Sequence, residues 1–412
     1  MLLGRWWMCL GLAMGLVGCA DDSGNEPAAT ESGAEEDTSG EETAGEETSG
    51  EEPFVPPVEP GKLIEIEPGG ETTCSRGTPF RFFVNGGSSN RVILDFGGGG
   101  ACWDSVTCSV AGAIFQEEAP SLATVQLAVD GGLLGGIYDR TDENNPFLDW
   151  TLVHVPYCTG DVHWGDATHE YGEDLTIHHR GAVNAKAVLE WVYANFPHPE
   201  QVFVTGCSAG AYGAIMHSAY IAEHYGEEVS VTALGDSGIG VITDTFFADS
   251  FPNWNAEAQL PDWIDAFQGI DINEMDITDV YSGIANHYPT QRFAHYTTAF
   301  DSNQEFYYTA MGGDVEEWNT TATQYLSQIR EEASNFRYFL APGEIHCAVI
   351  YDIFYDTAVG DVTLNSWVHD LVFGDSLPDD AVCEGEACAQ DVLCDICATS
   401  ESPGMWCGHC GN

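Results

Sequence analysis

The chain has 412 residues, 14 cysteines and a formal net charge of −55, with 11 Lys or Arg against 66 Asp or Glu. This length suits one large domain with appendages or two smaller domains. The acidic excess argues against partners that are nucleic acids and against electrostatic docking on anionic lipid.

The amino-terminal residues have the layout of an export signal. Arg5 precedes an apolar run, residues 6–17, that is too short for a permanent membrane span. The run ends at Leu16-Val17-Gly18-Cys19, which resembles the bacterial lipobox, whose cysteine receives diacylglycerol. We therefore predict a lipoprotein signal over 1–19, lipidation at Cys19 and an exported chain anchored by lipid to the bacterial cell envelope, at the outer membrane or cell surface. A plain signal peptide with an incidental cysteine is the alternative.

Three further regions follow the signal. Residues 20–60 are rich in Glu, Ser, Thr and Gly and nearly free of large apolar side chains, which predicts an acidic disordered tether. Residues 61–380 alternate apolar runs with amphipathic stretches, the pattern of an α/β domain with a mostly parallel sheet flanked by helices. Residues 381–412 hold six cysteines and form a small Cys-rich appendage.

The predicted elements of the α/β domain follow one another as short apolar strands and small-residue or amphipathic helices. The predicted strands lie within residues 91–100, 150–158, 201–206, 228–238, 292–301 and 336–347, and the predicted helices span residues 177–196, 209–226 and 366–374. Residues 245–290 are rich in Trp, Pro and Asp and are predicted to be a helical insertion over the site.

The pentapeptide Gly206-Cys207-Ser208-Ala209-Gly210 fits the G-x-S-x-G nucleophile elbow, with a β-rich run before it and a small-residue helix after it. A serine hydroxyl needs a histidine to remove its proton, and the histidine needs an acid to fix its tautomer. His346 follows the last clear strand, so we predict it as the base. Asp236 and Asp301 both follow strands, and we favour Asp301 because its strand immediately precedes the histidine strand.

A glycine-rich loop after an early strand supplies the remaining part of an acyl-transfer site. Ala209 and the "GGGG" segment, through Gly99 and Gly100, are predicted to donate backbone N–H groups to an oxyanion. A phosphate-binding role is not supported, because no Lys-Ser/Thr follows the loop and Asp95 and Asp104 flank it. The mechanism requires no cofactor, and we predict no metal.

These segments carry a family resemblance. "ILDFGGGGACW", "PYCTGDVHWGD", "VTGCSAGAYGA", "AFDSNQ" and "HCAV" occur in an order and spacing similar to those of the pectinacetylesterase and Notum family of serine esterases, over residues 62–375. The resemblance implies an α/β-hydrolase fold, a triad of Ser208, Asp301 and His346, and an oxyanion hole of Gly99, Gly100 and Ala209. Family members often have Gly-Gly-Trp where this chain has Gly100-Ala101, so acetyl specificity does not carry over directly.

Three further residues are predicted to shape the substrate cleft. Trp103 directly follows Cys102, whereas the tryptophan of the family's Gly-Gly-Trp segment precedes this cysteine. Asp161 and Trp164 follow a strand near the proposed site. The nearby histidines match no common zinc spacing and are interpreted as solvated or pocket-lining groups. They are His154, His163, His169, His178 and His179.

The even number of cysteines in the exported chain predicts disulfides. We expect Cys102 to pair with Cys108 and Cys207 to pair with Cys158. The six carboxy-terminal cysteines have partly zinc-ribbon-like spacing, but outside the cytoplasm three disulfides are the favoured reading.

We conclude from the sequence that the chain is a serine carboxylesterase acting on an ester substrate, with acetylated polysaccharide implied by the resemblance. One alternative is a lipase-like or polyester hydrolase of the same mechanism. The other is a surface binding protein on an inactive hydrolase scaffold, against which the ordered Ser, Asp and His residues speak.

Overall fold

The computed structural model of the protein describes residues 54–110, 112, 114–270 and 275–390. All elements below belong to one compact unit, which lies within residues 56–412. The predicted signal, Cys19 and most of the predicted tether lie outside the described residues, as do the last four cysteines of the Cys-rich segment.

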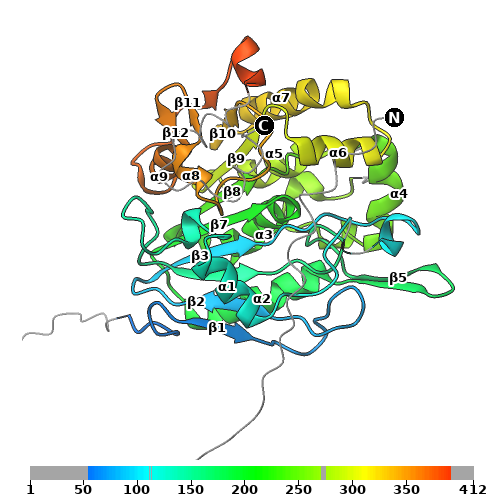
Figure 1. Cartoon of the computed structure of the whole chain (residues 1–412), viewed down its shortest axis with the longest axis horizontal. Coiled ribbons are helices and arrows are strands. Elements are labelled where there is room, and N and C mark those ends of the chain that lie inside the picture. Colours follow the sequence, from blue (N-terminus) through cyan, green and yellow to red (C-terminus); the bar gives the residue numbers. More distant parts are fainter. Residues whose placement is uncertain (1–53, 111, 113, 271–274, 391–412) are drawn as a thin grey trace, which may run out of the picture. The chain divides into compact units, whose positions relative to one another are not determined.

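A nine-stranded sheet forms the centre of the described domain (Figure 1). Its spatial order is β1-β2-β4-β3-β7-β8-β9-β10-β13. The strands are Leu63–Ile66 (β1), Phe82–Asn85 (β2), Thr151–Val155 (β4), Arg91–Phe96 (β3), Gln201–Cys207 (β7), Ser230–Asp236 (β8), Arg292–Thr298 (β9), Phe336–Ala341 (β10) and Ala381–Val382 (β13). The β1–β2 and β2–β4 pairs are antiparallel and every later pair is parallel. The predicted mostly parallel sheet is confirmed.

The central strands are apolar on both faces because helices cover both faces, as parallel sheets require. The helices are Leu122–Asp130 (α1), Gly181–Asn195 (α2), Ala209–Tyr225 (α3), Asp244–Trp254 (α4), Ile277–His287 (α5), Ser302–Ala310 (α6), Val315–Glu332 (α7), Ile353–Asp356 (α8) and Leu364–Phe373 (α9). Helix α3 packs along β3, β7 and β8. Ile93, Phe203 and Phe339 point to the opposite face and bury against Trp367 and Leu371 of α9.

Two small hairpins complete the described structure. One pairs Ala167–Gly172 (β5) with Leu175–His179 (β6), and the other pairs Ala358–Val359 (β11) with Val362–Thr363 (β12). The predicted helix over 177–196 therefore begins too early: residues 177–179 pair with β5, and α2 starts at Gly181, whose N–H donates to the Asp161 carboxylate.

The predicted helical insertion is helical in part. Within residues 245–270 and 275–290 it contains most of α4 and all of α5, joined through the short 3-10 turns Glu257–Gln259 and Asp265–Phe267. Helices α4 and α6 and the β5 hairpin lie on the right of Figure 1, away from α8 and α9. Among the described residues, no helix is long and apolar enough to cross a membrane.

Candidate active site

Ser208 occupies the sharp turn between β7 and α3. Its backbone has φ 60° and ψ −121°, a conformation that costs energy for a residue with a side chain and that is characteristic of nucleophile elbows. The flanking glycines permit the turn: a Cβ on Gly206 would lie 2.3 Å from the Gly210 carbonyl oxygen, and one on Gly210 would lie 1.9 Å from the Phe96 carbonyl oxygen. Both glycines are thus fixed by close backbone packing, and Ser208 itself remains half-buried.

His346 and Asp301 meet at the carboxyl ends of β10 and β9. The Nδ1 atom of His346 lies 2.8 and 2.9 Å from the two carboxylate oxygens of Asp301. Asp301 caps α6 and accepts the backbone N–H groups of Asn303 and Gln304, while the Gln304 side-chain amide donates to its other oxygen. The carboxylate is fully buried and held from several sides, so it can hold the imidazole in one orientation.

A disulfide joins the serine turn to the histidine loop. Cys207, which precedes Ser208, bonds to Cys347, which follows His346, with 5.6 Å between their Cα atoms. A ring nitrogen of His346 also lies within 4.8 Å of both sulfur atoms. The sequence-based pairing of Cys207 with Cys158 is wrong, because Cys158 bonds to Cys74 instead. Spacing along the chain cannot tell which loops meet at the end of a sheet.

Asp236 braces the same two loops from beneath. Its backbone carbonyl accepts the Ser208 N–H at 2.7 Å, and its carboxylate accepts the N–H groups of Ala348 and Val349. Burial raises the pKa of Asp236 to about 7, although those backbone hydrogen bonds act to lower it. Asp236 has no hydrogen bond to His346 among the described residues, and its carboxylate braces the loop that carries His346.

The hydrogen bond to Asp301 fixes which imidazole nitrogen is available. With the Nδ1 proton directed at the carboxylate, the lone pair of Nε2 is free, and Nε2 has no hydrogen-bond partner among the described groups, Ser208 included. Burial lowers the pKa of His346, but the charge of Asp301, the hydrogen bond to it and the charge of Asp236 outweigh burial and raise that pKa above its ordinary value. The site therefore stabilises the imidazolium that proton abstraction would create.

The glycine-rich loop after β3 lies against the serine turn. A Cβ on Gly98 would lie 3.0 Å from the Cβ of Ser208, so this backbone approaches the nucleophile directly. Gly99 and Gly100 both have positive φ, at 155° and 78°. Within the described part of the chain, the N–H groups of Gly99, Gly100 and Ala209 appear in none of the hydrogen bonds with other residues, which leaves them available to an oxyanion. Gly98 went unpredicted, although it belongs to the same "GGGG" run.

Of the three predicted cleft residues, Trp103 lines the described cavity and the other two are buried elsewhere. Trp103 is partly exposed and lines a cavity of about 550 Å³. Asp161 and Trp164 do not reach a cleft: Asp161 is fully buried and accepts from Thr159 Oγ1 and the Gly181 N–H, and the Trp164 indole donates to the Tyr212 carbonyl. For these two residues the prediction is wrong, because a polar side chain after a strand also serves to tie a buried turn.

The cavity lies where several segments that follow site residues come together. Its described lining is Trp103, Asp104, Ser105, His169, Glu170, Tyr171, Phe246, Ser250, Asn253, Ala310 and Met311. Trp103 follows the glycine loop, Phe246 follows the end of β8, and Met311 ends the helix that Asp301 begins. The described lining contains no triad residue, but the chain connects it to the candidate site through the glycine loop before Trp103 and through α6, which runs from Asp301 to Met311.

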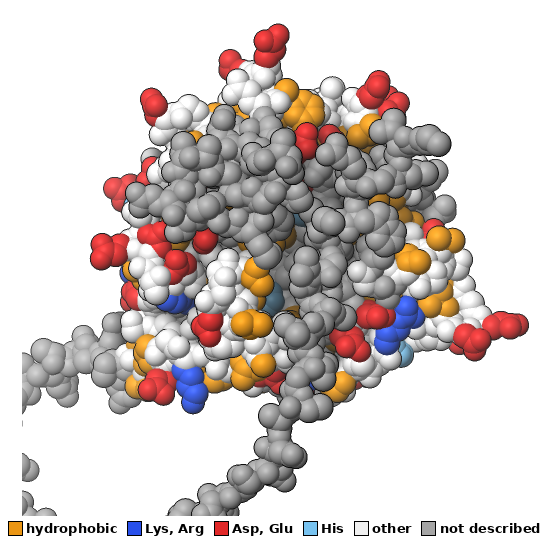
Figure 2. All heavy atoms as spheres, in the orientation of Figure 1, with side chains coloured by type: hydrophobic (Ala, Val, Ile, Leu, Met, Phe, Trp, Pro, Cys, Tyr) orange, Lys and Arg blue, Asp and Glu red, His pale blue; other side chains and the backbone are white. Residues whose placement is uncertain are grey.

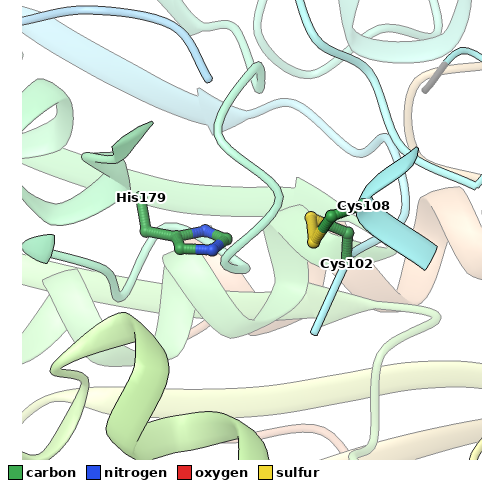
Figure 3. A group of neighbouring side chains, drawn as sticks. All are labelled: Cys102, Cys108 and His179. Carbon is green, nitrogen blue, oxygen red and sulfur yellow. A yellow bond between two sulfur atoms is a disulfide. The ribbon is translucent and has the colours of Figure 1, made fainter. Parts of the chain in front are cut away.

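The predicted disulfide between Cys102 and Cys108 is confirmed, and it lies next to His179 (Figure 3). His179 Nδ1 is hydrogen-bonded to the Thr159 carbonyl and Nε2 to the Tyr171 hydroxyl, so neither nitrogen is free for a metal in this state. Burial lowers the pKa of His179 to about 3. A further disulfide, Cys383 to Cys388, begins the Cys-rich segment.

The predicted solvated or pocket-lining role fits some of the neighbouring histidines and not others. His169 lines the cavity. His163 and His179 are instead buried and use their ring nitrogens to bind backbone carbonyls or a tyrosine hydroxyl. His154 pairs with Asp95, with Nδ1 2.8 Å from the carboxylate. Sequence spacing alone could not separate these environments.

Residues that the sequence reasoning missed support the candidate triad from behind. Gln304 binds Asp301, Thr297 Oγ1 and the Ile239 N–H, and thereby ties α6 to the segment after β8. Ser237 accepts the Cys347 N–H with its hydroxyl. The available signal was the position of Gln304 in "DSNQ", three residues after the acid, where a side chain can turn back to the helix cap.

The mostly parallel sheet and the sharp turn at Ser208 are those of the α/β-hydrolase fold, and comparison with solved structures agrees. The Wnt deacylase Notum from Drosophila superposes with a TM-score of 0.58 at 16% identity, covering 77% of this chain and 96% of its own. The predicted α/β-hydrolase fold is confirmed.

Sequence comparisons show what the chain is similar to. Residues 62–253 match the family model for pectinacetylesterase. Pectin acetylesterase 4 of Arabidopsis thaliana is 25% identical over 162 residues, 37% of either chain. Notum2 of Xenopus laevis, a palmitoleoyl-protein carboxylesterase, is 27% identical over 171 residues, 40% of this chain and 34% of its own. The chain thus spans less than two fifths of the length of these relatives. The predicted resemblance to the pectinacetylesterase and Notum family is confirmed as a similarity over this part of the chain.

Proposed function

We propose that the protein is an exported serine carboxylesterase in which Ser208 is the nucleophile, His346 the general base and Asp301 the acid that orients it. The observation that carries this proposal is the disulfide between Cys207 and Cys347, which holds the strained serine turn beside a histidine already paired with a buried carboxylate. Geometry of this kind is what acyl transfer by a serine requires.

The first half-reaction forms an acyl-enzyme. Ser208 Oγ attacks the ester carbonyl carbon while its proton moves to Nε2 of His346, the nitrogen that Asp301 leaves free. The carbonyl oxygen becomes an anion and accepts hydrogen bonds from the N–H groups of Gly99, Gly100 and Ala209, a role supported by the absence of other partners for these groups among the described residues. The tetrahedral intermediate then expels the alcohol, which leaves with the proton returned from Nε2.

The second half-reaction repeats these steps with water. Nε2 of His346 removes a proton from water, the resulting oxygen attacks the acyl carbon, and the free acid leaves as Ser208 regains its proton. The serine–imidazole hydrogen bond is absent in the resting protein and would form with substrate bound, as is common in such sites.

For the substrate we propose O-acetyl esters of a polysaccharide, in line with the pectin acetylesterases among the relatives. The Notum relatives are named as palmitoleoyl-protein carboxylesterases, so proteins similar to this chain also include esterases that act on a long acyl chain. Turnover of p-nitrophenyl esters from acetate to palmitate distinguishes these. A preference for acetate supports the proposal, and a preference for chains of eight or more carbons identifies a lipase-like enzyme.

We also propose that Cys19 is lipidated and anchors the protein to the cell envelope, on the basis of the Leu-Val-Gly-Cys segment and the acidic stretch after it. The test is metabolic labelling with a palmitate analogue in a bacterial host. Label that is present in the wild type and lost in Cys19→Ser supports the anchor, and label retained in the variant rejects it.

The esterase proposal is tested with a fluorophosphonate probe followed by peptide mapping, beside p-nitrophenyl acetate turnover of wild type and Ser208→Ala. Label on Ser208 and loss of turnover in the variant are expected. Folded protein that stays unlabelled would contradict the triad and favour a binding scaffold.

A further inference from the structure

The cavity beside Trp103 has an unusual chemical lining for its size. Trp103, Tyr171 and Phe246 supply aromatic rings, Asp104 and Glu170 supply carboxylates, and the described lining contains no Lys or Arg. Aromatic faces with nearby carboxylates are the surroundings that stabilise organic cations, ammonium groups above all.

The aromatic walls are held in place without a ligand. Trp103 and Phe246 meet edge to face with 5.0 Å between ring centroids. The Trp254 indole donates to the Cys102 carbonyl at 3.1 Å, which ties α4 to the loop that carries Trp103. The Tyr171 hydroxyl is occupied by His179. The cavity is therefore largely pre-formed, which lowers the entropic cost of binding.

One of the two carboxylates is fixed on the same short loop as Trp103. Asp104 is exposed and uses one oxygen to accept the N–H groups of Val106 and Thr107, which fixes the carboxylate on the short loop closed by the Cys102–Cys108 disulfide. Burial raises the pKa of Tyr171, and the negative charge of Asp104 contributes to that rise. The ring and the carboxylate thus share one electrostatic environment.

The charge of the wider domain also favours the binding of cations. Residues 54–390 contain 10 Lys or Arg against 50 Asp or Glu, and the face shown in Figure 2 displays more acidic than basic side chains. Many of the few basic side chains are paired, as in Arg76–Glu117, Arg91–Glu200 and Arg330–Asp380. Such a surface attracts cationic ligands and repels polyanions such as polygalacturonate.

We propose that the Trp103 cavity binds the positively charged part of the substrate, so that the ester hydrolysed is one whose alcohol portion carries an ammonium group. The geometry assigns Trp103, Tyr171 and Phe246 to the cation–π contacts and Asp104 and Glu170 to charge neutralisation. An acetyl ester on an amino-sugar polymer is the class of natural substrate that satisfies both this cavity and the acyl site. The link to turnover rests on the proposed esterase function, but cation binding does not.

Binding is measured first on Ser208→Ala protein, so that no turnover is needed. Phenyltrimethylammonium is titrated against the full chain by calorimetry, with tert-butylbenzene as its uncharged counterpart. Saturable binding of the cation is expected, weakened about tenfold by Trp103→Ala and at least threefold by Asp104→Asn or Glu170→Gln. Glu190→Gln, an exposed acid on α2, removes the same charge elsewhere and serves as the control. Equal binding in all variants, or no binding, overturns the cavity assignment.

Turnover is then compared for acetylcholine and 3,3-dimethylbutyl acetate, which have the same shape and differ in charge. The cation site predicts kcat/KM about tenfold higher for acetylcholine, falling toward parity in Asp104→Asn and in high salt. Equal kcat/KM values overturn the cation site and leave the esterase standing. Cation binding without hydrolysis of either ester, or of p-nitrophenyl acetate, rejects the esterase and leaves the cation site standing.

Discussion

Of the three histidine–aspartate pairs among the described residues, the two buried ones are almost identical in geometry, whereas His369–Asp370 is exposed. In each buried pair Nδ1 lies 2.8 Å from a carboxylate oxygen, the histidine side chain is 16% exposed and the carboxylate is at most 2% exposed. His346–Asp301 joins the ends of β10 and β9, and His154–Asp95 joins β4 and β3, where the two residues are neighbours in register.

The surroundings of the two pairs differ. The disulfide at Cys347 holds His346 beside the elbow serine, whereas His154 has the Tyr138 hydroxyl as its neighbour, and that hydroxyl donates to Asp95. Burial and then the charge of Asp95 raise the pKa of Tyr138 well above its ordinary value, so the phenol stays protonated and is no nucleophile at neutral pH. A buried His–Asp pair therefore does not make a triad, and the third group decides what the pair can do.

The largest expected effect separates the two histidines. His346→Asn keeps a donor toward Asp301 but removes Nε2, so kcat should fall by about 10⁴-fold or more. The matched change His154→Asn should leave kcat within about tenfold. Steady-state kinetics with p-nitrophenyl acetate measure both, and circular dichroism verifies folding. Equal losses in the two folded variants would mean that the wrong pair has been assigned to catalysis.

Substitutions of the two carboxylates should differ almost as widely in their effect on kcat. Asp301→Asn cannot stabilise the imidazolium and turns a charged acceptor into an amide, so kcat should fall by about 10³- to 10⁴-fold. The Asp95 side chain contacts Tyr138 and His154, so Asp95→Asn should lower the midpoint of thermal unfolding more than it lowers kcat. If Asp95→Asn inactivates a stable protein, the β3–β4 pair has a catalytic role after all.

The disulfide that distinguishes the pairs should contribute strongly to stability. Cys207 and Cys347 are 140 residues apart, and Cys102 and Cys108 only six. Loop-closure entropy predicts a loss of roughly 5 kcal/mol in unfolding free energy when both cysteines of the first pair become alanine, and of about 2 kcal/mol for the second pair. Urea unfolding tests the order. A larger loss for the short loop would show that native strain, not chain entropy, dominates.

The smallest expected effect is on pH dependence. Only neutral His346 can accept a proton, and its pKa is raised, so kcat/KM should fall as the pH drops through a midpoint above that of an ordinary histidine. The charge of Asp236 contributes to that rise, and Asp236→Asn should move the midpoint down by about half a unit, because Asp236 itself is only partly ionised near its pKa of about 7. The variant should therefore retain more activity in acid, and an upward shift would contradict this coupling.

Much of this arrangement could be predicted from the sequence. Buried parallel strands appear as short apolar runs, which is why β3, β4, β7, β8, β9 and β10 were located, and the small residues around Ser208 indicate a turn with no room for side chains. The order of Ser208, Asp301 and His346 along the chain then places three groups at one edge of the sheet.

The remainder depends on contacts between distant segments. Residues 177–179 fit a helical pattern, but pairing with β5 determines their conformation. Asp161 and Trp164 follow a strand as cleft residues do, yet hydrogen bonds to a buried turn and to α3 fix them inside. The partner of Cys207 depends on which loop lies opposite the elbow, a property of the folded sheet that local spacing does not encode.

The bond between Cys207 and Cys347 also has a consequence for timing. The two cysteines adjoin Ser208 and His346, the proposed nucleophile and base, so the oxidation that cross-links the chain also ties these two residues together. A newly made chain in a reducing compartment keeps these cysteines as thiols, and its two half-sites are joined only by the sheet beneath them. Under the proposed function, competence for hydrolysis would therefore follow arrival in an oxidising environment, and the esters of the compartment in which the chain is synthesised would be protected from it.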